Sequence, residues 1–432
     1  MVAYWFRRDL RLRDNHALFR ALSENPEVLP VFIFDEAILS KLPKQDRRVD
    51  YIHRRLSELD TYLRSKGLGG ILVLHGSVDE CWGKIARDYD LEGVYCNRDY
   101  EPSAIDRDFR VEEFFRGRGG FFKSFKDQVI FEEADILKAD QTPYTIYTPY
   151  KKQWLKHFEQ KFVDAYSSEQ YLESFSIKEL PQVPQLEDLG FAPTDLVEPP
   201  IELNEEFIKE YDEVRNYPAL DKTSRLSVVL RFGTVSVRSL VRRALDLNET
   251  WLSELIWREF FMMILCHFPE SSHQEFKLKY SQIKWRNNEV DFEAWCQGKT
   301  GYELVDAGMR ELNETGFMHN RVRMVVASFL VKHLLIDWRW GERYFAEKLL
   351  DYDLSANAGN WQWAAGTGCD AAPYFRVFNP YTQAEKFDKN REYIKRWVPE
   401  VDTLLYPEEM VDHKMARERA LRVYKEGLAL YE

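Results

Sequence analysis

Along the first 130 residues, short runs of apolar residues alternate with longer amphipathic segments. The apolar runs lie at residues 2–6, 28–34, 70–76 and 93–97. Each has the length of a buried strand, and between them apolar residues recur every three or four positions, which predicts helices. Because alternating strands and helices form right-handed βαβ units, this region predicts an α/β domain with a doubly wound parallel sheet.

The pattern changes twice farther along the chain. Residues 131–200 contain PQVPQLEDLGFAPTDLVEPP, whose prolines and acids favour an extended connector. Later segments such as MHNRVRMVVASFLVKHLLIDW carry apolar residues at helical spacing, and few segments alternate like strands. We therefore expect an α/β domain at 1–130, a connector at 131–200 and an all-α domain at 201–432.

Composition narrows the class of protein. Of the 432 residues, 45% are hydrophobic and 31% charged, which is typical of globular proteins with two or three domains. No apolar run reaches the roughly 18 residues that a membrane span needs, and the N-terminus lacks a signal-peptide pattern. We expect a cytoplasmic protein without membrane contact.

The five cysteines form no CxxC and the nine histidines show no ligand spacing, so no metal site is predicted.

The net charge of −12 does not exclude a nucleic-acid partner. Residues 163–213 contain 14 acidic residues and two lysines, so the rest of the chain is neutral. A neutral remainder leaves room for a local basic face. The 12 tryptophans belong to a core, or stack on bases or on a planar cofactor.

Three motifs of the helical region carry candidate chemistry, and each has a plain structural alternative. TSRLS (223–227) either caps a helix or binds phosphate at a helix N-terminus. LIWREFF (255–261) is typical of a half-buried helix with a salt bridge. HNRVRM (319–324) is either a solvated helix end or a surface that contacts anions and base edges.

A fourth motif joins two carboxylates to a stretch of small residues. Asp351 and Asp353 precede ANAGNWQWAAGTG (356–368), in which two tryptophans stand among Gly, Ala and Asn. The carboxylates can act as a general acid/base pair, bind a metal or pair with arginines such as Arg323. The small residues allow close approach of backbone or ligand.

Taken together, these motifs resemble those of the photolyase/cryptochrome family over essentially the full length of the chain. The matching landmarks lie at 5–18, 223–227, 254–260, 298–312, 316–345 and 351–380. The resemblance implies an N-terminal α/β domain and a helical domain that holds FAD. No GxGxxG follows the first strand, where RRDLRLRD stands instead, so the usual dinucleotide fingerprint is absent.

The resemblance also implies which residues contact the flavin. The phosphate and ribityl contacts are Tyr211, Thr223, Ser224, Arg225, Leu226 and Ser227. The same pocket is lined by Trp251 and Arg258. The isoalloxazine and ribose are surrounded by Asn320, Arg323, Asp351, Tyr352 and Asp353, with Arg323 and Asp351 as an ion pair. Asn357 stands where the family places its residue beside flavin N5, and its amide can adapt its hydrogen bonding to the flavin's protonation state.

Several positions favour repair of cyclobutane pyrimidine dimers. Repair enzymes of the family generally carry Asn at the position of Asn357, and no signalling-type tail precedes the end at Glu432. His319–Asn320 and Met324 resemble the cyclobutane-dimer pattern rather than the (6-4) pattern. The implied catalytic residues are Glu254, Met324 and Asn357. The implied contacts to UV-damaged DNA and the flipped dimer are Arg215, Glu254, Trp257, Asn320, Arg321, Met324, Trp363, Arg376 and Gln383.

The implied chemistry is electron transfer from light-excited, reduced FAD to the flipped dimer. Trp361, Trp338 and Trp285 match the family's photoreduction chain. An antenna chromophore is expected to be a deazaflavin or flavin rather than folate, because Ala104 and Ser272 fall where folate-binding relatives often carry a carboxylate and a lysine. We expect a monomer. The alternatives are a DASH-type cryptochrome that acts on single-stranded DNA and a blue-light receptor without repair activity.

Overall fold

The computed structural model describes residues 1–431, which form two units. Unit 1 consists of Met1–Ile136, Trp154–Leu203 and Arg225–Leu247. Unit 2 consists of Leu137–Gln153, Asn204–Ser224 and the chain from Asn248 onward. The chain therefore passes from one unit to the other several times. The predicted domains, by contrast, are consecutive stretches of the chain with boundaries at residues 130 and 200.

Unit 1 is built on a five-stranded parallel sheet with the strand order β3-β2-β1-β4-β5. The strands are β1 (Val2–Phe6), β2 (Val28–Asp35), β3 (Leu72–Gly76), β4 (Gly93–Asn97) and β5 (Phe121–Phe125). The prediction of a doubly wound parallel sheet is confirmed. The sequence analysis missed β5, because this edge strand, FFKSF, is half-exposed and lacks the continuous apolar run of the inner strands.

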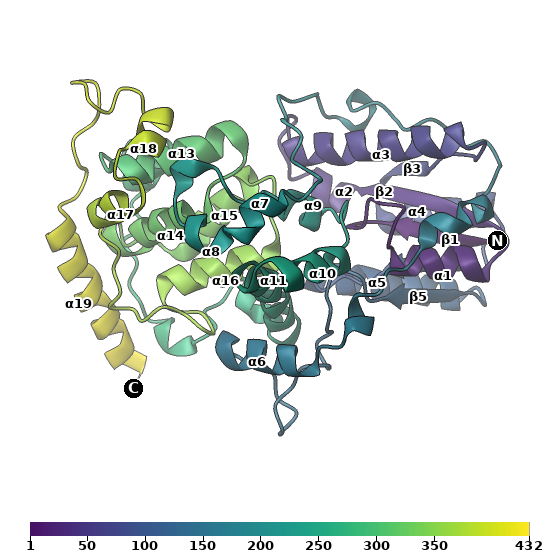
Figure 1. The fold of residues 1–432 in the computed structure, drawn as a ribbon, viewed down its shortest axis with the longest axis horizontal. Helices are drawn as coiled ribbons and strands as arrows, with labels where there is room; N and C mark the ends of the chain where they lie inside the picture. The colour runs from purple at the N-terminus through teal and green to yellow at the C-terminus, as the bar shows by residue number, and fades with distance from the viewer. Residues whose placement is uncertain (432) are drawn as a thin grey trace. The chain divides into compact units, whose positions relative to one another are not determined.

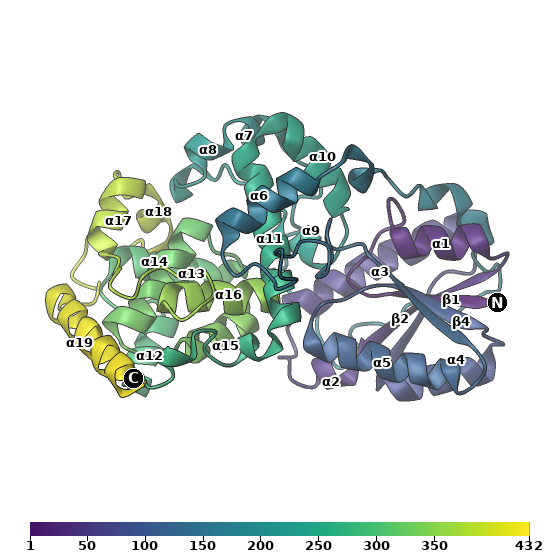
Figure 2. The same ribbon diagram turned by 90° about the horizontal axis from the view of Figure 1, so that it is seen from below.

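Helices cover both faces of this sheet. They are α1 (His16–Glu24), α2 (Glu36–Leu39), α3 (Arg47–Ser65), α4 (Val78–Asp88) and α5 (Pro102–Arg116). In Figure 2, α1 lies on one side of the strands, and α4 and α5 lie on the other. Trp82 of α4 and Phe115 of α5 pack into the core cluster that the strands form around Trp5.

The segment RRDLRLRD, which follows β1, forms ion pairs within unit 1. Arg11 Nη2 lies 2.6 Å from Asp127 Oδ2, and both side chains are buried. Arg238, from a later segment, pairs with the same carboxylate through Asp127 Oδ1 at 2.8 Å. These two guanidinium groups hold the pKa of Asp127 at about 2, overcoming the opposing effect of burial. In this chain the segment forms ion pairs that connect parts of unit 1 that are far apart in the sequence.

The later segments of unit 1 contain short helices. They are η1 (Gln160–Val163), η2 (Ser168–Ser174), η3 (Glu187–Leu189), α9 (Ser227–Arg231) and α10 (Val237–Leu247). The last part of the predicted connector packs along α3: Thr194 donates to Asp50 Oδ2 through both its N–H and its hydroxyl. The acidic, proline-rich segment is therefore held to the surface of unit 1.

Unit 2 is helical, and no strand is assigned to it within the described residues, which confirms the all-α prediction. Its early and connecting helices are α6 (Tyr147–His157), which continues into unit 1, α7 (Glu205–Lys209), α8 (Tyr211–Val214), η4 (Pro218–Leu220), η5 (Pro269–Ser272) and η6 (Leu278–Tyr280). Its main helices are α11 (Glu249–His267), α12 (Glu289–Cys296), α13 (Glu303–Thr315), α14 (Asn320–Ser328), the π-helix η7 (Phe329–His333), α15 (Trp338–Lys348), α16 (Leu354–Ala365), α17 (Pro380–Phe387), α18 (Glu392–Trp397) and α19 (His413–Tyr431).

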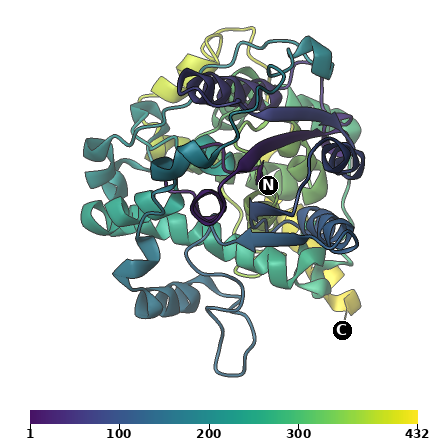
Figure 3. The ribbon, with the colours of Figure 1, turned by 90° about the vertical axis from the view of Figure 1, so that its right-hand side faces the viewer.

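Helices α13, α14, α15 and α16 form the centre of unit 2 (Figure 1). Their buried faces share one hydrophobic cluster that includes Trp295, Trp338 and Trp361. A loop closed by a bridge between Leu137 and Pro143 precedes α6 and hangs at the bottom of Figure 3. No helix among residues 1–431 is long and apolar enough to cross a membrane.

Candidate functional site

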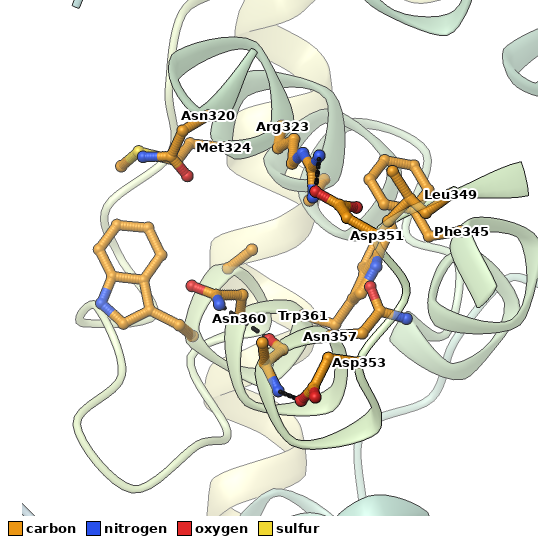
Figure 4. Close-up of a pocket in the computed structure, with 14 residues that line it drawn as sticks. Asn320, Arg323, Met324, Phe345, Leu349, Asp351, Asp353, Asn357, Asn360 and Trp361 are labelled. Atoms are coloured by element: carbon orange, nitrogen blue, oxygen red, sulfur yellow. Dashed lines mark hydrogen bonds and ion pairs between the residues drawn. The ribbon is translucent and has the colours of Figure 1, made fainter. Parts of the chain in front are cut away.

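A pocket in unit 2 lies between α14, α16 and the segment that precedes α16. It encloses about 610 Å³ of space, part of it open to solvent. Figure 4 shows polar side chains from both helices around this space. Eight residues singled out from the sequence line it, namely Asn320, Arg323, Met324, Asp351, Asp353, Asn357, Trp361 and Trp363.

Helix α14 presents one face to the pocket because of its residue spacing. Asn320, Arg323, Met324 and Ala327 stand at positions i, i+3, i+4 and i+7, which share one side of a helix. The valines at 322, 325 and 326 point into the core. His319 caps the helix, since its Nδ1 accepts the N–H of Arg321 at 3.2 Å. The HNRVRM motif therefore forms a capped helix start whose polar face lines a pocket.

Helix α16 uses its small residues on two sides. Ala356 and Ala364 line the pocket, where short side chains leave space. Gly359 meets α11, and a Cβ there would lie only 2.3 Å from Phe261 Cδ1. Asp353 caps the helix by accepting the N–H of Ala356 at 3.2 Å. The small residues thus serve both close helix packing and an open cavity.

Arg323 and Asp351 form an ion pair at the pocket wall, with Nη2 and Oδ2 2.9 Å apart. The Arg323 Nε donates to the Met318 carbonyl at 2.7 Å, which orients the guanidinium. Asp351 has 5% of its side chain exposed, and its Oδ1 is buried without a hydrogen-bond partner. Since buried polar atoms are normally satisfied, this oxygen is suited to a donor on a bound molecule.

Asn357 is held by Glu342, a residue that the sequence analysis missed. Its Nδ2 donates to Glu342 Oε1 at 2.9 Å and to the Glu342 carbonyl at 3.0 Å. Burial raises the pKa of Glu342 above its ordinary value of 4.5, although hydrogen bonds from Asn357 and Tyr352 oppose the shift. Both contacts use the NH₂ group, so the Asn357 Oδ1 remains an acceptor. The only sequence signal for Glu342 is its place in the motif WRWGERYF.

A second group of predicted residues gathers where α8 meets α11. Glu254 of α11 accepts a hydrogen bond from the Arg215 guanidinium, which also lies over the Tyr211 ring at 5.4 Å. Burial raises the pKa of Glu254, while the charge of Arg215 opposes the shift. This carboxyl therefore holds a proton more readily than an ordinary glutamate.

Trp257 of α11 is stacked on Tyr147 of α6, another residue that sequence reasoning missed. The ring centroids are 3.6 Å apart and the planes differ by 9°. The Tyr147 hydroxyl donates to the Ser253 carbonyl at 2.8 Å, and its N–H donates to Asp370 Oδ2 at 3.1 Å. The aromatic run PYTIYTPY around Tyr147 was the signal that could have found it.

Two predicted arginines, Arg215 and Arg376, act electrostatically on a third, Arg321. Burial and the charges of Arg215 and Arg376 lower the pKa of Arg321. The Arg321 guanidinium donates to Asn216 Oδ1 at 2.6 Å and lies over the Phe387 ring at 4.3 Å. Gln383, on the same helix as Phe387, has a buried Oε1 without a hydrogen-bond partner. Concentrated cationic charge of this kind favours an anionic partner.

The three tryptophans of the predicted photoreduction chain all lie in unit 2. Trp361 and Trp338 are buried in the central cluster, and Trp285 is half-buried and packs against it. Trp361 is also in edge-on contact with Trp295, which the sequence analysis did not single out. The order in which these indoles transfer an electron stays a prediction.

The other predicted flavin residues lie outside the pocket. Trp251 is buried on α11, and Arg258 is half-buried on the same helix. TSRLS is divided, because Thr223 and Ser224 belong to unit 2 and the next three residues to unit 1. Helix α9 begins at Ser227 and has no side-chain cap, so the helix-cap interpretation of this motif is wrong. Among residues 1–431, no cluster of His, Cys, Asp and Glu could hold a metal ion.

Comparison with known proteins decides the family. Two family models match, one described as "DNA photolyase" over residues 2–168 and one as "FAD binding domain of DNA photolyase" over residues 251–405. A deoxyribodipyrimidine photo-lyase of Vibrio cholerae is 36% identical, and the match covers 98% of this chain and 99% of the relative.

The chain belongs to the photolyase/cryptochrome family. Among solved structures, a class III photolyase from Agrobacterium tumefaciens matches with a TM-score of 0.88 at 33% identity, covering 99% of this chain and 97% of the other. An archaeal photolyase from Sulfolobus tokodaii, solved with two FAD molecules, matches with a TM-score of 0.81 at 34% identity and covers 98% and 99%. The predicted family, enzyme class and FAD cofactor of this photolyase-family chain are thereby confirmed.

Proposed function

We propose that this photolyase-family enzyme repairs cyclobutane pyrimidine dimers in DNA in a light-dependent reaction. The observation that carries the proposal is the pocket between α14 and α16. It joins residues that the family resemblance assigns to the flavin, such as Asn357, to residues assigned to the dimer, such as Met324 and Trp363. A pocket shared by a cofactor and a substrate suits direct electron transfer between them.

The residues present fit FAD. The buried, unpartnered Asp351 Oδ1 is suited to accept a hydrogen bond from the cofactor, and the ion pair with Arg323 holds this carboxylate in place. The Asn357 Oδ1 is suited to accept the N–H that a reduced flavin carries at N5, because Glu342 occupies the amide NH₂. When bound, reduced FAD supplies the electron that opens the cyclobutane ring. The TSRLS residues remain the proposed phosphate contacts.

The dimer is proposed to lie between Trp257 and Trp363 beside Met324. Flipping bases out of a duplex costs on the order of a few kcal/mol, and stacking on an aromatic ring returns about 1–3 kcal/mol per base. Glu254, whose pKa is raised by burial, would donate its proton in a hydrogen bond to a pyrimidine carbonyl. Tyr147 would keep the Trp257 ring in place for this contact.

The DNA backbone is proposed to bind the arginines at positions 215, 321 and 376, together with Asn320 and Gln383. Phosphates neutralise cationic side chains and position a protein on its duplex. Burial and the charges of Arg215 and Arg376 lower the pKa of Arg321, and a bound phosphate would relieve the repulsion that these two charges exert on it, which supports this placement.

Trp361, Trp338 and Trp285 are proposed to reduce oxidised flavin in light. The burial of the first two and the half-exposure of Trp285 agree with a path from a pocket to the surface.

A separate antenna chromophore is proposed to be a deazaflavin or flavin. Ala104 is a buried apolar residue, so it offers folate no carboxylate. Chromophores released by denaturation and identified by mass would test this proposal, and stoichiometric folate would contradict it.

The deciding experiment is a repair assay with chemically reduced protein. A cyclobutane thymine dimer would be placed in duplex DNA and in single-stranded DNA, and a (6-4) lesion would be run alongside, in blue light and in darkness. We expect light-dependent loss of the cyclobutane dimer in duplex DNA alone or in both forms. Repair confined to single strands would indicate a DASH-type enzyme. Bound FAD without repair would overturn the proposal in favour of a photoreceptor.

A further inference from the structure

The helix α19 lies along the outer side of unit 2 (Figure 1) and packs on the π-helix η7. We propose that α19 is an acid-released latch, docked on unit 2 at neutral pH and released in mild acid through the paired imidazoles of His333 and His413. Neither the proposed flavin pocket nor the proposed DNA surface uses this contact, so the inference does not depend on the proposed repair activity.

The two imidazoles share one hydrogen bond where α19 begins. The His333 Nε2 and the His413 Nδ1 are 2.8 Å apart, so one of these nitrogens carries a proton and the other accepts it. His333 is fully buried and stacked on Phe329 at 4.7 Å, and its Nδ1 has no hydrogen-bond partner. Protonation of both rings would set two N–H donors and two positive charges against each other, which breaks the contact.

The surroundings of this pair disfavour additional positive charge. Arg419 donates to the His333 main-chain carbonyl, and burial together with the charges of His413 and Arg419 lowers the pKa of His333 to about 3. Burial and the charge of Arg417 lower the pKa of His413, although two nearby carboxylates oppose the shift. The titratable and charged groups around the contact are Tyr302 from the start of α13, Lys332 from η7, Glu409 and Asp412 from the loop before α19, and Arg417 and Arg419 from α19.

Lys332 adds a second buried cationic group to the same interface. Its side chain is 1% exposed, and its Nζ donates to the Ala365 carbonyl at 2.8 Å. The same Nζ lies 3.7 Å from the ring centroid of Tyr424 on α19. Burial lowers the pKa of Lys332 well below 10.5, and no carboxylate among residues 1–431 offsets this effect. Docking of α19 therefore covers a lysine that is protonated more readily in water, which acts in the same direction as the histidines.

The sign of the pH dependence follows from these shifts. In released α19 the imidazoles would return to water, where their ordinary pKa is about 6.5. Because the pKa of each histidine is lower in the docked state, the released state binds protons more readily, and docking weakens as the pH falls below about 6.5. Between pH 7.5 and 5.5, His333 alone should raise the released fraction by about tenfold.

Release of α19 would change the surface of unit 2. Tyr424 is fully buried, stacks on Tyr374 at 5.9 Å and meets Trp285 edge-on at 5.9 Å. Its hydroxyl donates to the Ala365 carbonyl at 2.8 Å, at the end of α16. Without α19, the half-buried Trp285 would gain exposure to solvent and the loop that carries Tyr374 would lose its stacking partner.

The test measures amide hydrogen exchange in the 432-residue protein at pH 7.5 and 5.5, with each rate normalised to the intrinsic rate at that pH. We expect the protection of residues 413–431 to fall by about tenfold or more at pH 5.5, while α13 and α14 stay protected. The double variant His333→Gln/His413→Asn keeps a hydrogen-bonding pair that does not titrate, so its fall should be smaller by about tenfold or more. The part caused by Lys332 remains. His75→Asn, at an exposed histidine of unit 1, is the matched control.

A charge reversal gives the opposite expectation. The carboxylate of His333→Glu reaches about as far as the imidazole Nε2 and would pair with protonated His413, so α19 should stay protected at pH 5.5. Protection that falls equally in the wild type and the double variant, or that does not fall in the wild type, would overturn the latch. Loss of protection throughout unit 2 would also overturn it, because it indicates general acid unfolding. Protection of α13 and α14 at pH 7.5 shows that a variant has folded, and His413→Asn alone replaces the double variant if that one does not fold.

Discussion

Asn357 donates both hydrogens of its amide group to one residue, Glu342, through the carboxylate at 2.9 Å and the main-chain carbonyl at 3.0 Å. The contact joins α16 to α15 and fixes which atom of Asn357 stays free for a ligand. Amide oxygen and nitrogen are otherwise interchangeable in shape, so the partner decides the orientation. Glu342 is therefore a positioning residue for the proposed flavin contact.

Glu342 makes the stability of the protein depend on pH. Because its folded pKa is raised above 4.5, the ionised carboxylate costs stability, and this cost develops as the pH rises from 4.5 through the folded pKa. Glu342→Gln should therefore raise the Tm at neutral pH, and the gain should vanish below about pH 4.5. Thermal melts between pH 4 and 8 measure this, with the exposed Glu385→Gln as control. A gain that persists at low pH would contradict the assignment.

Arg323 and Asp351 should differ in what their loss costs. Arg323→Ala leaves a carboxylate that is only 5% exposed without its partner, which should cost about 2–3 kcal/mol of unfolding free energy. Asp351→Asn should cost less, since the Arg323 side chain is 26% exposed and can be hydrated. Denaturant titration of both variants, together with their FAD dissociation constants, measures the difference. Equal costs would show that the buried carboxylate is no costlier to leave unpaired than the half-exposed guanidinium.

Glu254 should make dimer binding depend on pH. As the pH falls through its raised pKa, the carboxyl gains a proton and can donate it to a pyrimidine carbonyl, so binding should tighten. Glu254→Gln keeps a donor at every pH and should flatten this profile. Glu254→Ala should weaken binding by about tenfold, the worth of one hydrogen bond. Fluorescence anisotropy with a dimer-containing duplex in darkness measures all three proteins, and an unaltered profile in Glu254→Gln would refute the role.

The stack of Tyr147 on Trp257 should contribute to dimer affinity. An aromatic pair is worth about 0.5–1.5 kcal/mol beyond its buried area, so Tyr147→Ala should weaken binding by about two- to tenfold. Tyr147→Phe preserves the ring and should bind nearly as well as the wild type. Tyr144→Ala, three residues earlier, is the control. Equal affinities for the Ala and Phe variants of Tyr147 would show that Trp257 needs no support.

Trp361 should be essential for photoreduction but not for repair. The proposed photoreduction chain begins at this indole, so Trp361→Phe should abolish most light-driven reduction of oxidised flavin. Repair by chemically reduced protein should remain largely intact, because the electron then comes from the flavin itself. Absorbance during illumination and a parallel repair assay measure the two effects. Unchanged photoreduction would disprove the role of Trp361 in this chain.

Local patterns placed the candidate residues on their elements, whereas their roles came from the family resemblance. The helical spacing of the apolar residues in MHNRVRMVVASFLVKHLLIDW placed Asn320, Arg323 and Met324 on a helix, and the small residues around Trp361 indicated close approach of backbone or ligand. These are properties of neighbours along one element, which helical and strand periodicity report directly. The edge strand β5 escaped the same reasoning because only a buried strand needs a continuous apolar run.

By itself, the sequence determined the parallel sheet, the helical unit, the family resemblance and the candidate residues. Only the tertiary structure decided that Glu342 orients Asn357, that Tyr147 stacks on Trp257 and that Trp295 touches Trp361. It also decided that the TSRLS motif is divided between the two units. Periodicity records which face of an element is buried. It does not record which distant side chain packs against that face, because this depends on how separate elements pack.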